Sequence, residues 1–180
     1  MALFNFLKKK QNKTSDILIP KVCPTNIPTE ISEKIDQINW ADFETAYGNA
    51  EKTIPSYLKN LFCTDTEIAM DATHQLWCSL CHQHAYISTA ALPSYDILKI
   101  GLLQLDDKLK VELLDIFQGF SECTSDRYFT SMKIEISDWE AEIKQKLFSD
   151  IELFEKLTKH SDEEISGFAS NIVDNLTNTE

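Results

Sequence analysis

The segments Ile54-Pro55-Ser56-Tyr57 and Leu92-Pro93-Ser94-Tyr95 nearly repeat each other and lie 38 residues apart in a chain of 180 residues. Each is followed by an apolar run at helical spacing, an acidic turn and a second apolar run. A repeat of this length is typical of stacked helix pairs, in which each pair covers the apolar face of the next. The chain is therefore predicted to be all-α, a short right-handed α-solenoid of antiparallel helix pairs.

The second helix of each pair is predicted to begin at an equivalent aspartate. Asp106 lies 41 positions after Asp65, and Asp162 lies 97 positions after Asp65. Apolar residues follow the three aspartates at shared offsets. The pairs are predicted over residues 50–62 and 65–82, over 88–104 and 106–121, and over a long run 139–157 with a helix after Ser161. Capping boxes, in which a side-chain oxygen and a glutamate satisfy free N–H groups, mark three helix starts: Thr64-x-x-Glu67, Ser137-x-x-Glu140 and Ser161-x-x-Glu164.

Residues 29–180 are predicted to form one helical-repeat domain, and residues 1–28 an N-terminal strap. Three prolines within the strap disfavour helix there: Pro20, Pro24 and Pro28. The first helix is predicted to begin near Thr29 and to continue to Gly48, a residue type that often ends helices. The segment 122–136 is predicted to be an irregular insertion with a short extended piece at its end.

The chain is strongly acidic, with a net charge of −12 and a single arginine, Arg127. Nucleic-acid binding depends on Lys and Arg that neutralise phosphates, so this balance argues against nucleic acid as a partner. An acidic surface instead favours a basic protein partner, because complementary charge speeds encounter and selects against other surfaces.

Five cysteines and the order of residues at the N-terminus bear on location. A signal peptide places basic residues before a longer apolar stretch, whereas here a short apolar stretch precedes Lys8-Lys9-Lys10. An odd cysteine count without such a signal predicts reduced thiols and a cytoplasmic protein. No window approaches the length of about 18 apolar residues that a membrane helix needs.

Several motifs resemble those of bacterial HEAT-repeat proteins. The matching stretches are Ala46-Tyr47-Gly48-Asn49-Ala50 followed by Ile54-Pro55, and His82-Gln83-x-x-Tyr86 followed by Leu92-Pro93. The resemblance covers residues 40–120 well and 139–177 loosely, and it implies a helical-repeat fold whose members mostly have no assigned activity. Cys81 stands where that family commonly has tryptophan, and His84 where it commonly has glycine. Residues 1–10 resemble the starts of small bacterial proteins encoded beside polymorphic toxins, which are often immunity factors.

A cluster of cysteines and histidines is the candidate for metal chemistry: His74, Cys78, Cys81, His82 and His84. Thiolates and imidazoles are zinc ligands, and Cys78-Ser79-Leu80-Cys81-His82 also spells a haem-attachment motif. A structural zinc site usually draws ligands from two segments, and no second Cys or His pair occurs. Buried thiols are therefore favoured over metal, no cofactor is predicted, and His82 with Gln83 is expected to tie its helix end to the next pair.

No motif for a nucleophile, a metalloprotease or a phosphate loop occurs, so no catalytic residue is predicted. The predicted function is non-enzymatic protein binding, with four candidate partner-binding residues: Asp71, His74, Glu112 and Asp115. The sharper hypothesis is an immunity protein that neutralises a basic toxin domain. The alternatives are a general HEAT-like scaffold or adaptor, a zinc-binding helical module, and a DNA glycosylase, which would need a basic concave face.

Overall fold

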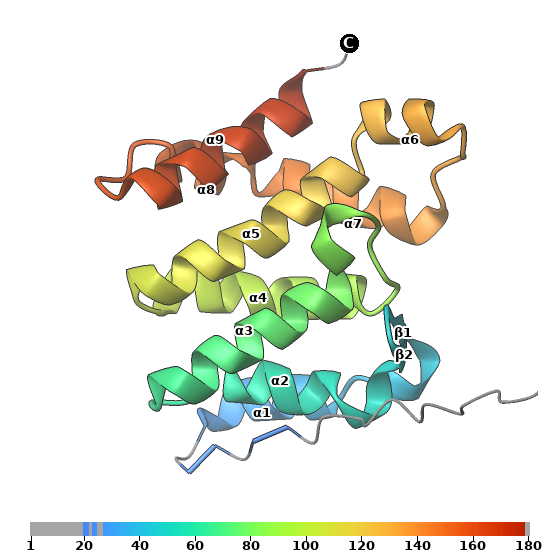
Figure 1. Cartoon of the computed structure of the whole chain (residues 1–180). Helices are drawn as coiled ribbons and strands as arrows, with labels where there is room; N and C mark the ends of the chain where they lie inside the picture. The colour runs from blue at the N-terminus through green and yellow to red at the C-terminus, as the bar shows by residue number, and fades with distance from the viewer. Residues whose placement is uncertain (1–19, 22, 25–26, 179–180) are drawn as a thin grey trace, which may run out of the picture.

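The computed structural model describes residues 20–21, 23–24 and 27–178, and in these the chain is predominantly helical, which confirms the all-α class (Figure 1). The α-helices of this part are α1 (Thr29–Asp36), α2 (Ile54–Asn60), α3 (Thr66–Leu80), α4 (Ala91–Gln104), α5 (Asp107–Cys123), α6 (Asp126–Met132), α7 (Asp138–Ser149), α8 (Ile151–Leu157) and α9 (Glu163–Thr177). Three 3₁₀ turns and a short hairpin complete it: η1 (Trp40–Asp42), β1 (Glu44–Thr45), β2 (Gly48–Asn49), η2 (Ala50–Lys52) and η3 (His82–His84).

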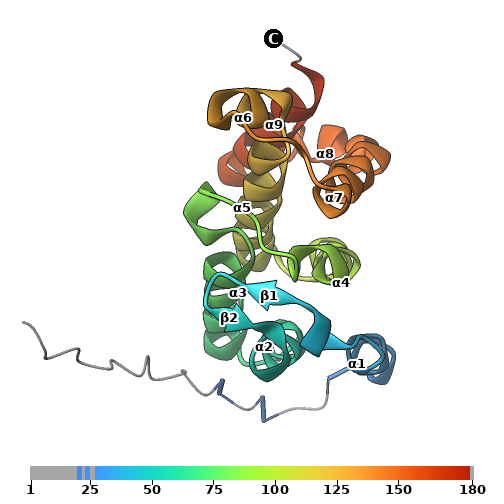
Figure 2. The ribbon, with the colours of Figure 1, turned by 90° about the vertical axis from the view of Figure 1, so that its right-hand side faces the viewer.

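The helices lie in two layers. α3, α5 and α9 pack side by side in one layer, and α2, α4 and α7 follow one another in the second. Figure 2 shows α3, α5 and α9 stacked along one side, with α4, α7 and α8 on the other. α8 contacts α7 and continues the second layer, so each layer contributes one helix to the contacting pairs α2–α3, α4–α5 and α8–α9. η3 and α6 also contact α5, so the face of this layer that the second layer leaves uncovered is only partly open to solvent.

Aspartates begin the outer helices, as the repeat offsets predict. Asp65 accepts hydrogen bonds from the N–H groups two and three residues on, at 3.0 and 3.3 Å, and Asp162 does so at 2.9 and 3.2 Å. Asp106 accepts one from Leu109 at 3.1 Å. Each carboxylate satisfies donors that the first turn leaves unpaired. The N-caps predicted at Thr64 and Ser161 are therefore wrong by one residue, whereas the capping box of Ser137 is confirmed.

The helix predicted over 50–62 is divided into η2 and α2, the one predicted over 88–104 begins at Ala91, and three further differences are larger. α1 begins at Thr29 as predicted but ends at Asp36, because the indole of buried Trp40 turns back and donates to the carbonyl of Ile35 at 2.9 Å. The run predicted as one helix over 139–157 divides at Asp150 into α7 and α8. The segment predicted to be irregular contains α6, which Ser125 caps.

The core joins the layers through large aromatic side chains. Tyr95 of α4 meets Phe117 of α5 edge to face with ring centroids 5.2 Å apart, and Phe117 lies 5.6 Å from Phe154 of α8. All three are essentially inaccessible to solvent. Burial of each ring contributes on the order of 2 kcal/mol. These rings join the layer of α3, α5 and α9 to the helices α4 and α8 that pack against it.

Cys23 and Cys63 form a disulfide, so the prediction of uniformly reduced thiols is wrong for this pair; Cys78, Cys81 and Cys123 are free. The pairing joins positions 40 residues apart, whose Cα atoms the fold brings to 5.7 Å, within the ordinary range for a disulfide. Most of the predicted strap, residues 1–28, lies outside the described residues. In the described part of the chain, no helix has the length and apolar character needed to cross a membrane.

Candidate functional site

Three aromatic rings lie together on the surface where α3 ends. Tyr47 stands at the tip of the hairpin and is 69% exposed, and Tyr86 in the turn after α3 is 42% exposed. The ring of His82 lies between them, with its centroid 5.8 Å from that of Tyr47 and 5.1 Å from that of Tyr86. We call Tyr47, His82 and Tyr86 the aromatic cluster. Exposed aromatic rings in contact with one another are typical of protein-binding surfaces.

The aromatic cluster is positioned by backbone hydrogen bonds. The N–H of Ala46 donates to the carbonyl of Ser79 at 3.0 Å, which ties the hairpin to the last turn of α3. The N–H of Ala90 donates to the carbonyl of Glu44 at 3.0 Å, which ties the start of α4 to the same hairpin. Figures 1 and 2 both show β1 and β2 beside the end of α3. Tyr47 is therefore carried by a turn that two helices hold in place.

Cys78 and His74 extend the surface along α3. The Cys78 sulfur lies 3.7 Å from Nε2 of His74, and the Tyr47 hydroxyl hydrogen-bonds the same sulfur. Burial raises the pKa of the Cys78 thiol, which outweighs the opposite effect of the Tyr47 hydrogen bond. The thiol is therefore protonated at neutral pH, and the Cys78–His74 pair lacks the thiolate that a nucleophile needs.

His84 joins the turn after α3 to α5. Its Nε2 lies 3.0 Å from a carboxylate oxygen of Asp115, and its Nδ1 lies 3.0 Å from one of Glu122. Hydrogen bonds to Asp115 and then to Glu122 raise the pKa of His84 to about 10, against the opposing effect of burial. The hydrogen bond from His84 lowers the pKa of Glu122 in return. We call these three residues the His84 junction, an imidazolium held between two carboxylates.

The junction corrects the expected role of this turn. His84, rather than His82, ties the end of α3 to the next helix pair; the side chain of Gln83 lies outside the described residues. His84 has a φ of +59°, a left-handed conformation that favours glycine. Gly119 of α5 lies directly beneath it, where an added Cβ would meet the imidazole at 2.8 Å and Cys81 at 3.0 Å. This close approach lets the imidazole reach both carboxylates.

The five candidate metal ligands are not brought together. Cys81 is fully buried, its thiol donates to the carbonyl of Trp77 at 3.3 Å, and burial raises its pKa strongly. His74 and Cys78 face outward, and both ring nitrogens of His84 are occupied by the junction. Among the described residues, no group of three or more His, Cys, Asp or Glu side chains is arranged to hold a metal ion.

Of the four candidate partner-binding residues on α3 and α5, His74 is exposed, whereas Asp71, Glu112 and Asp115 are half-buried. Burial and then the charge of Asp115 raise the pKa of Glu112, while His74 lowers it, so these three side chains share one electrostatic environment. On the other flank of α3, burial and then the charge of the Asp71 carboxylate raise the pKa of Tyr57 of α2. Asp115 already pairs with His84, which leaves Asp71, His74 and Glu112 for a partner.

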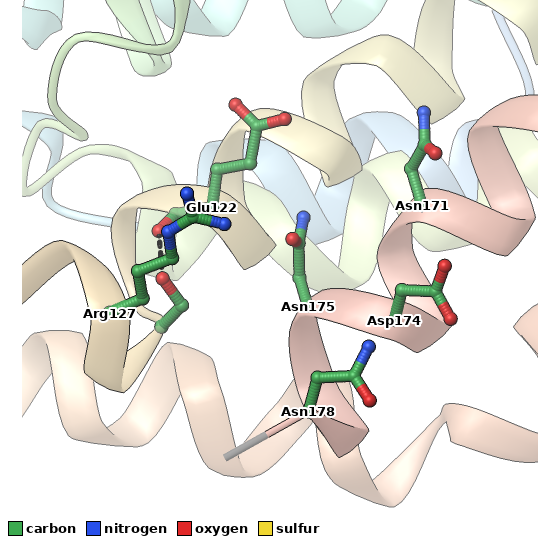
Figure 3. A pocket seen from close by; sticks show the side chains of 7 residues that line it. Glu122, Arg127, Asn171, Asp174, Asn175 and Asn178 are labelled. Carbon is green, nitrogen blue, oxygen red and sulfur yellow. Dashed lines mark hydrogen bonds between the residues drawn. The ribbon is translucent and has the colours of Figure 1, made fainter. Parts of the chain in front are cut away.

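A polar pocket of about 620 Å³ opens at the far end of the same layer, between α5, α6 and α9. Figure 3 shows Arg127 of α6 on one side of it and Asn171, Asp174 and Asn175 of α9 on the other. Sequence reasoning did not identify this pocket. The available signal was the position of the single arginine, whose neighbours only the fold defines.

Comparisons of the chain with protein-family models, with curated proteins and with solved structures find no match. The resemblance to HEAT-repeat proteins therefore stays a prediction. Any function has to be argued from the surfaces described above.

Proposed function

We propose that this chain is a non-enzymatic protein-binding module, built as a short right-handed solenoid of HEAT-like helix pairs. The pairing of α2 with α3, α4 with α5 and α8 with α9 supports the repeat. So do the aspartates that cap the three outer helices at offsets of 41 and 97 residues. The left-handed backbone at His84, where the resembling family commonly has glycine, agrees with that alignment.

The aromatic cluster is the observation that carries the proposal. Tyrosine and tryptophan are enriched among the residues that dominate binding energy, because they bury a large area with little loss of conformational freedom. Here Tyr47 and Tyr86 remain exposed, although hydrogen bonds hold the hairpin that carries Tyr47 to the end of α3 and the start of α4. A rigid exposed ring loses little entropy when a partner covers it.

The charge of the surroundings suggests a basic partner. Asp71 lies on α3, the helix that ends at the aromatic cluster, Glu112 lies on the neighbouring helix α5, and the whole chain carries a net charge of −12. A lysine or arginine of a partner gains both from the carboxylates and from the face of a tyrosine ring. The proposed partner is therefore a protein with a basic surface, and the sharper form of the proposal is an immunity protein that covers a basic toxin domain.

A general adaptor is the second candidate. For either candidate, the disulfide bears on the compartment in which the protein acts. The cytosol keeps thiols reduced, whereas the structure pairs Cys23 with Cys63. The cytoplasmic location predicted for an immunity protein thus requires this pair to be reduced in cells. Alkylation of thiols in intact cells, followed by mass spectrometry, distinguishes a cytoplasmic protein with modified Cys23 and Cys63 from one in an oxidising compartment.

The experiment measures, by calorimetry, binding of the full chain to any toxin domain that is encoded beside its gene. We expect the Tyr47→Ala plus Tyr86→Ala double variant to lose about 30-fold or more in affinity, as for two hot-spot residues. The matched control is Leu103→Ala plus Phe148→Ala, which removes side chains 59% and 41% exposed on α4 and α7. Equal affinity of the tyrosine variant and the wild type would reject this binding surface. Absence of binding by the wild type would reject the immunity role and leave the adaptor.

A further inference from the structure

One wall of the polar pocket carries Arg127, a cation with no ion-pair partner among the described residues. Arg127 is the only arginine of the chain, and the chain has 29 acidic residues. Nevertheless, Arg127 makes none of the ion pairs found among the described residues, although lysines on several helices do. A guanidinium at the wall of a pocket that pairs with no carboxylate of the described residues is available to bind an anionic group bidentately.

The carboxylates of the pocket are not equivalent. One oxygen of Glu122 pairs with His84 at 3.0 Å, and the other accepts from Gln118 at 2.7 Å, so its charge is compensated within the protein. Asp174 makes no ion pair among the described residues. The lining therefore leaves one uncompensated positive charge on α6 and one uncompensated negative charge on α9, on opposite sides of the pocket in Figure 3.

Between these charges, two amides are held in a fixed orientation. The Nδ2 group of Asn171 donates to Gln118 at 3.0 Å, and that of Asn175 donates to the hydroxyl of Ser121 at 3.0 Å. Both amide nitrogens are thus tied to α5, which leaves the amide oxygens as acceptors for N–H groups. No aromatic or aliphatic side chain lines the pocket, so a planar or apolar ligand finds nothing to stack on.

We propose that this pocket binds an amino-acid-type zwitterion, with its carboxylate on Arg127 and its ammonium group at Asp174 and the asparagine oxygens. No ion pair links Arg127 to Asp174, so the ligand must span the distance between them. Two sources share this chemistry: a free amino acid and a short peptide with free termini. The site is separate from the aromatic cluster. If the pocket bound no zwitterion, the proposed protein-binding function would be unaffected.

The experiment titrates glycine, diglycine, triglycine and tetraglycine into the full-length ¹⁵N-labelled protein and follows amide shifts by NMR. Each added residue lengthens an extended chain by about 3.5 Å, so the series varies the separation of the two charges without changing their chemistry. We expect shifts confined to α6 and the second half of α9. Strongest binding by glycine would identify a free amino acid, and strongest binding by a longer member would identify a peptide.

Blocked ligands and charge-removing variants test the assignment of the two ends. Acetylation of the amine or amidation of the carboxylate of the best ligand is expected to weaken binding about tenfold or more. The Arg127→Gln variant should bind the amidated and the unblocked ligand equally well. The Asp174→Asn variant should bind the acetylated and the unblocked ligand equally well. The controls are Lys108→Gln and Glu163→Gln, both on exposed residues outside the pocket. No shift with any member of the series, equal binding of blocked ligands, or unchanged binding by both pocket variants would overturn the proposal.

Discussion

Two histidines in one short turn have opposite surroundings. His84 is largely buried and lies between Asp115 and Glu122, so its imidazolium connects the outer helices α3 and α5. His82 lies between two exposed tyrosines, edge-on to Tyr47 and tilted against Tyr86, and its Nδ1 atom is buried without a hydrogen-bond partner in the described part of the chain. Both residues have positive φ angles, of +59° and +32°. His84 therefore stabilises the fold, whereas His82 forms part of an exposed surface.

Replacement of each histidine by glutamine is the strongest test of this difference. His84→Gln removes an ion pair at each ring nitrogen and leaves two partly buried carboxylates close together, so we expect a loss of about 2–3 kcal/mol in the free energy of unfolding. His82→Gln removes only ring contacts and should cost under about 1 kcal/mol. Urea unfolding of both variants, which share a left-handed position and a new side chain, provides the measurement. Equal losses would contradict the division between the two histidines.

Glycine substitutions sharpen the same comparison through packing. Gly119→Ala places a methyl group 2.8 Å from the imidazole of His84 and 3.0 Å from Cys81, and neither can move without disturbing the junction. We expect this substitution to destabilise the protein by about 1–2 kcal/mol. Gly167→Ala on α9 meets nothing within 4 Å and should stabilise by about 0.5–1 kcal/mol, because alanine is the better helix former. Thermal unfolding of the two variants shows whether each substitution stabilises or destabilises the protein. A stabilising Gly119→Ala would show that the His84 junction is not tightly packed.

The pH dependence of stability should also distinguish the histidines. The pKa of His84 rises from 6.5 to about 10 on folding, so its stabilisation is fully present below pH 6.5 and is lost as the pH rises through about 10. We expect the advantage of the wild type over His84→Gln to fall by about 1–2 kcal/mol across this window, after screening at the partly exposed carboxylates. Glu122, whose pKa is lowered, loses its contribution at the acidic end as the pH falls through its folded value. Urea unfolding from neutral to alkaline pH provides the measurement. A constant difference in stability between the wild type and His84→Gln would contradict the role of His84.

The smallest effect on stability is expected at the aromatic cluster itself. Tyr47→Ala plus Tyr86→Ala removes exposed rings and should change the free energy of unfolding by less than about 1 kcal/mol. The same double variant is expected to lose most of its affinity for the partner. Denaturant unfolding measured beside the binding experiment separates the two effects. A large loss of stability would show that these rings support the fold.

The sequence predicted the helical class because its signals are local. Aspartates at shared offsets and apolar residues at helical spacing located α3, α5 and α9 to within a few residues. The errors arose where contacts distant in sequence decide the outcome. Cys63, for example, pairs with Cys23 across 40 residues. The early end of α1 is a local exception, because the indole of Trp40 donates to the carbonyl of Ile35.

The candidate site was predicted only in part, for the same reason. The turn after α3 was recognised as a junction, but the carboxylates that choose His84 over His82 come from α5. Tyr47 was recognised only within a family-like motif, because its exposure depends on the hairpin that replaces the end of the predicted first helix. The charges around Arg127 come from three helices and could not be assembled from their spacing.

Hydrogen exchange of the full chain with and without the basic toxin domain tests the central claim most directly, since it reports which backbone segments a partner covers. The account predicts slower exchange in the hairpin residues 44–49 and in the turn 82–86, with α4 and α7 unchanged. Protection confined to α4 and α7, with the hairpin and the turn unaffected, would contradict it.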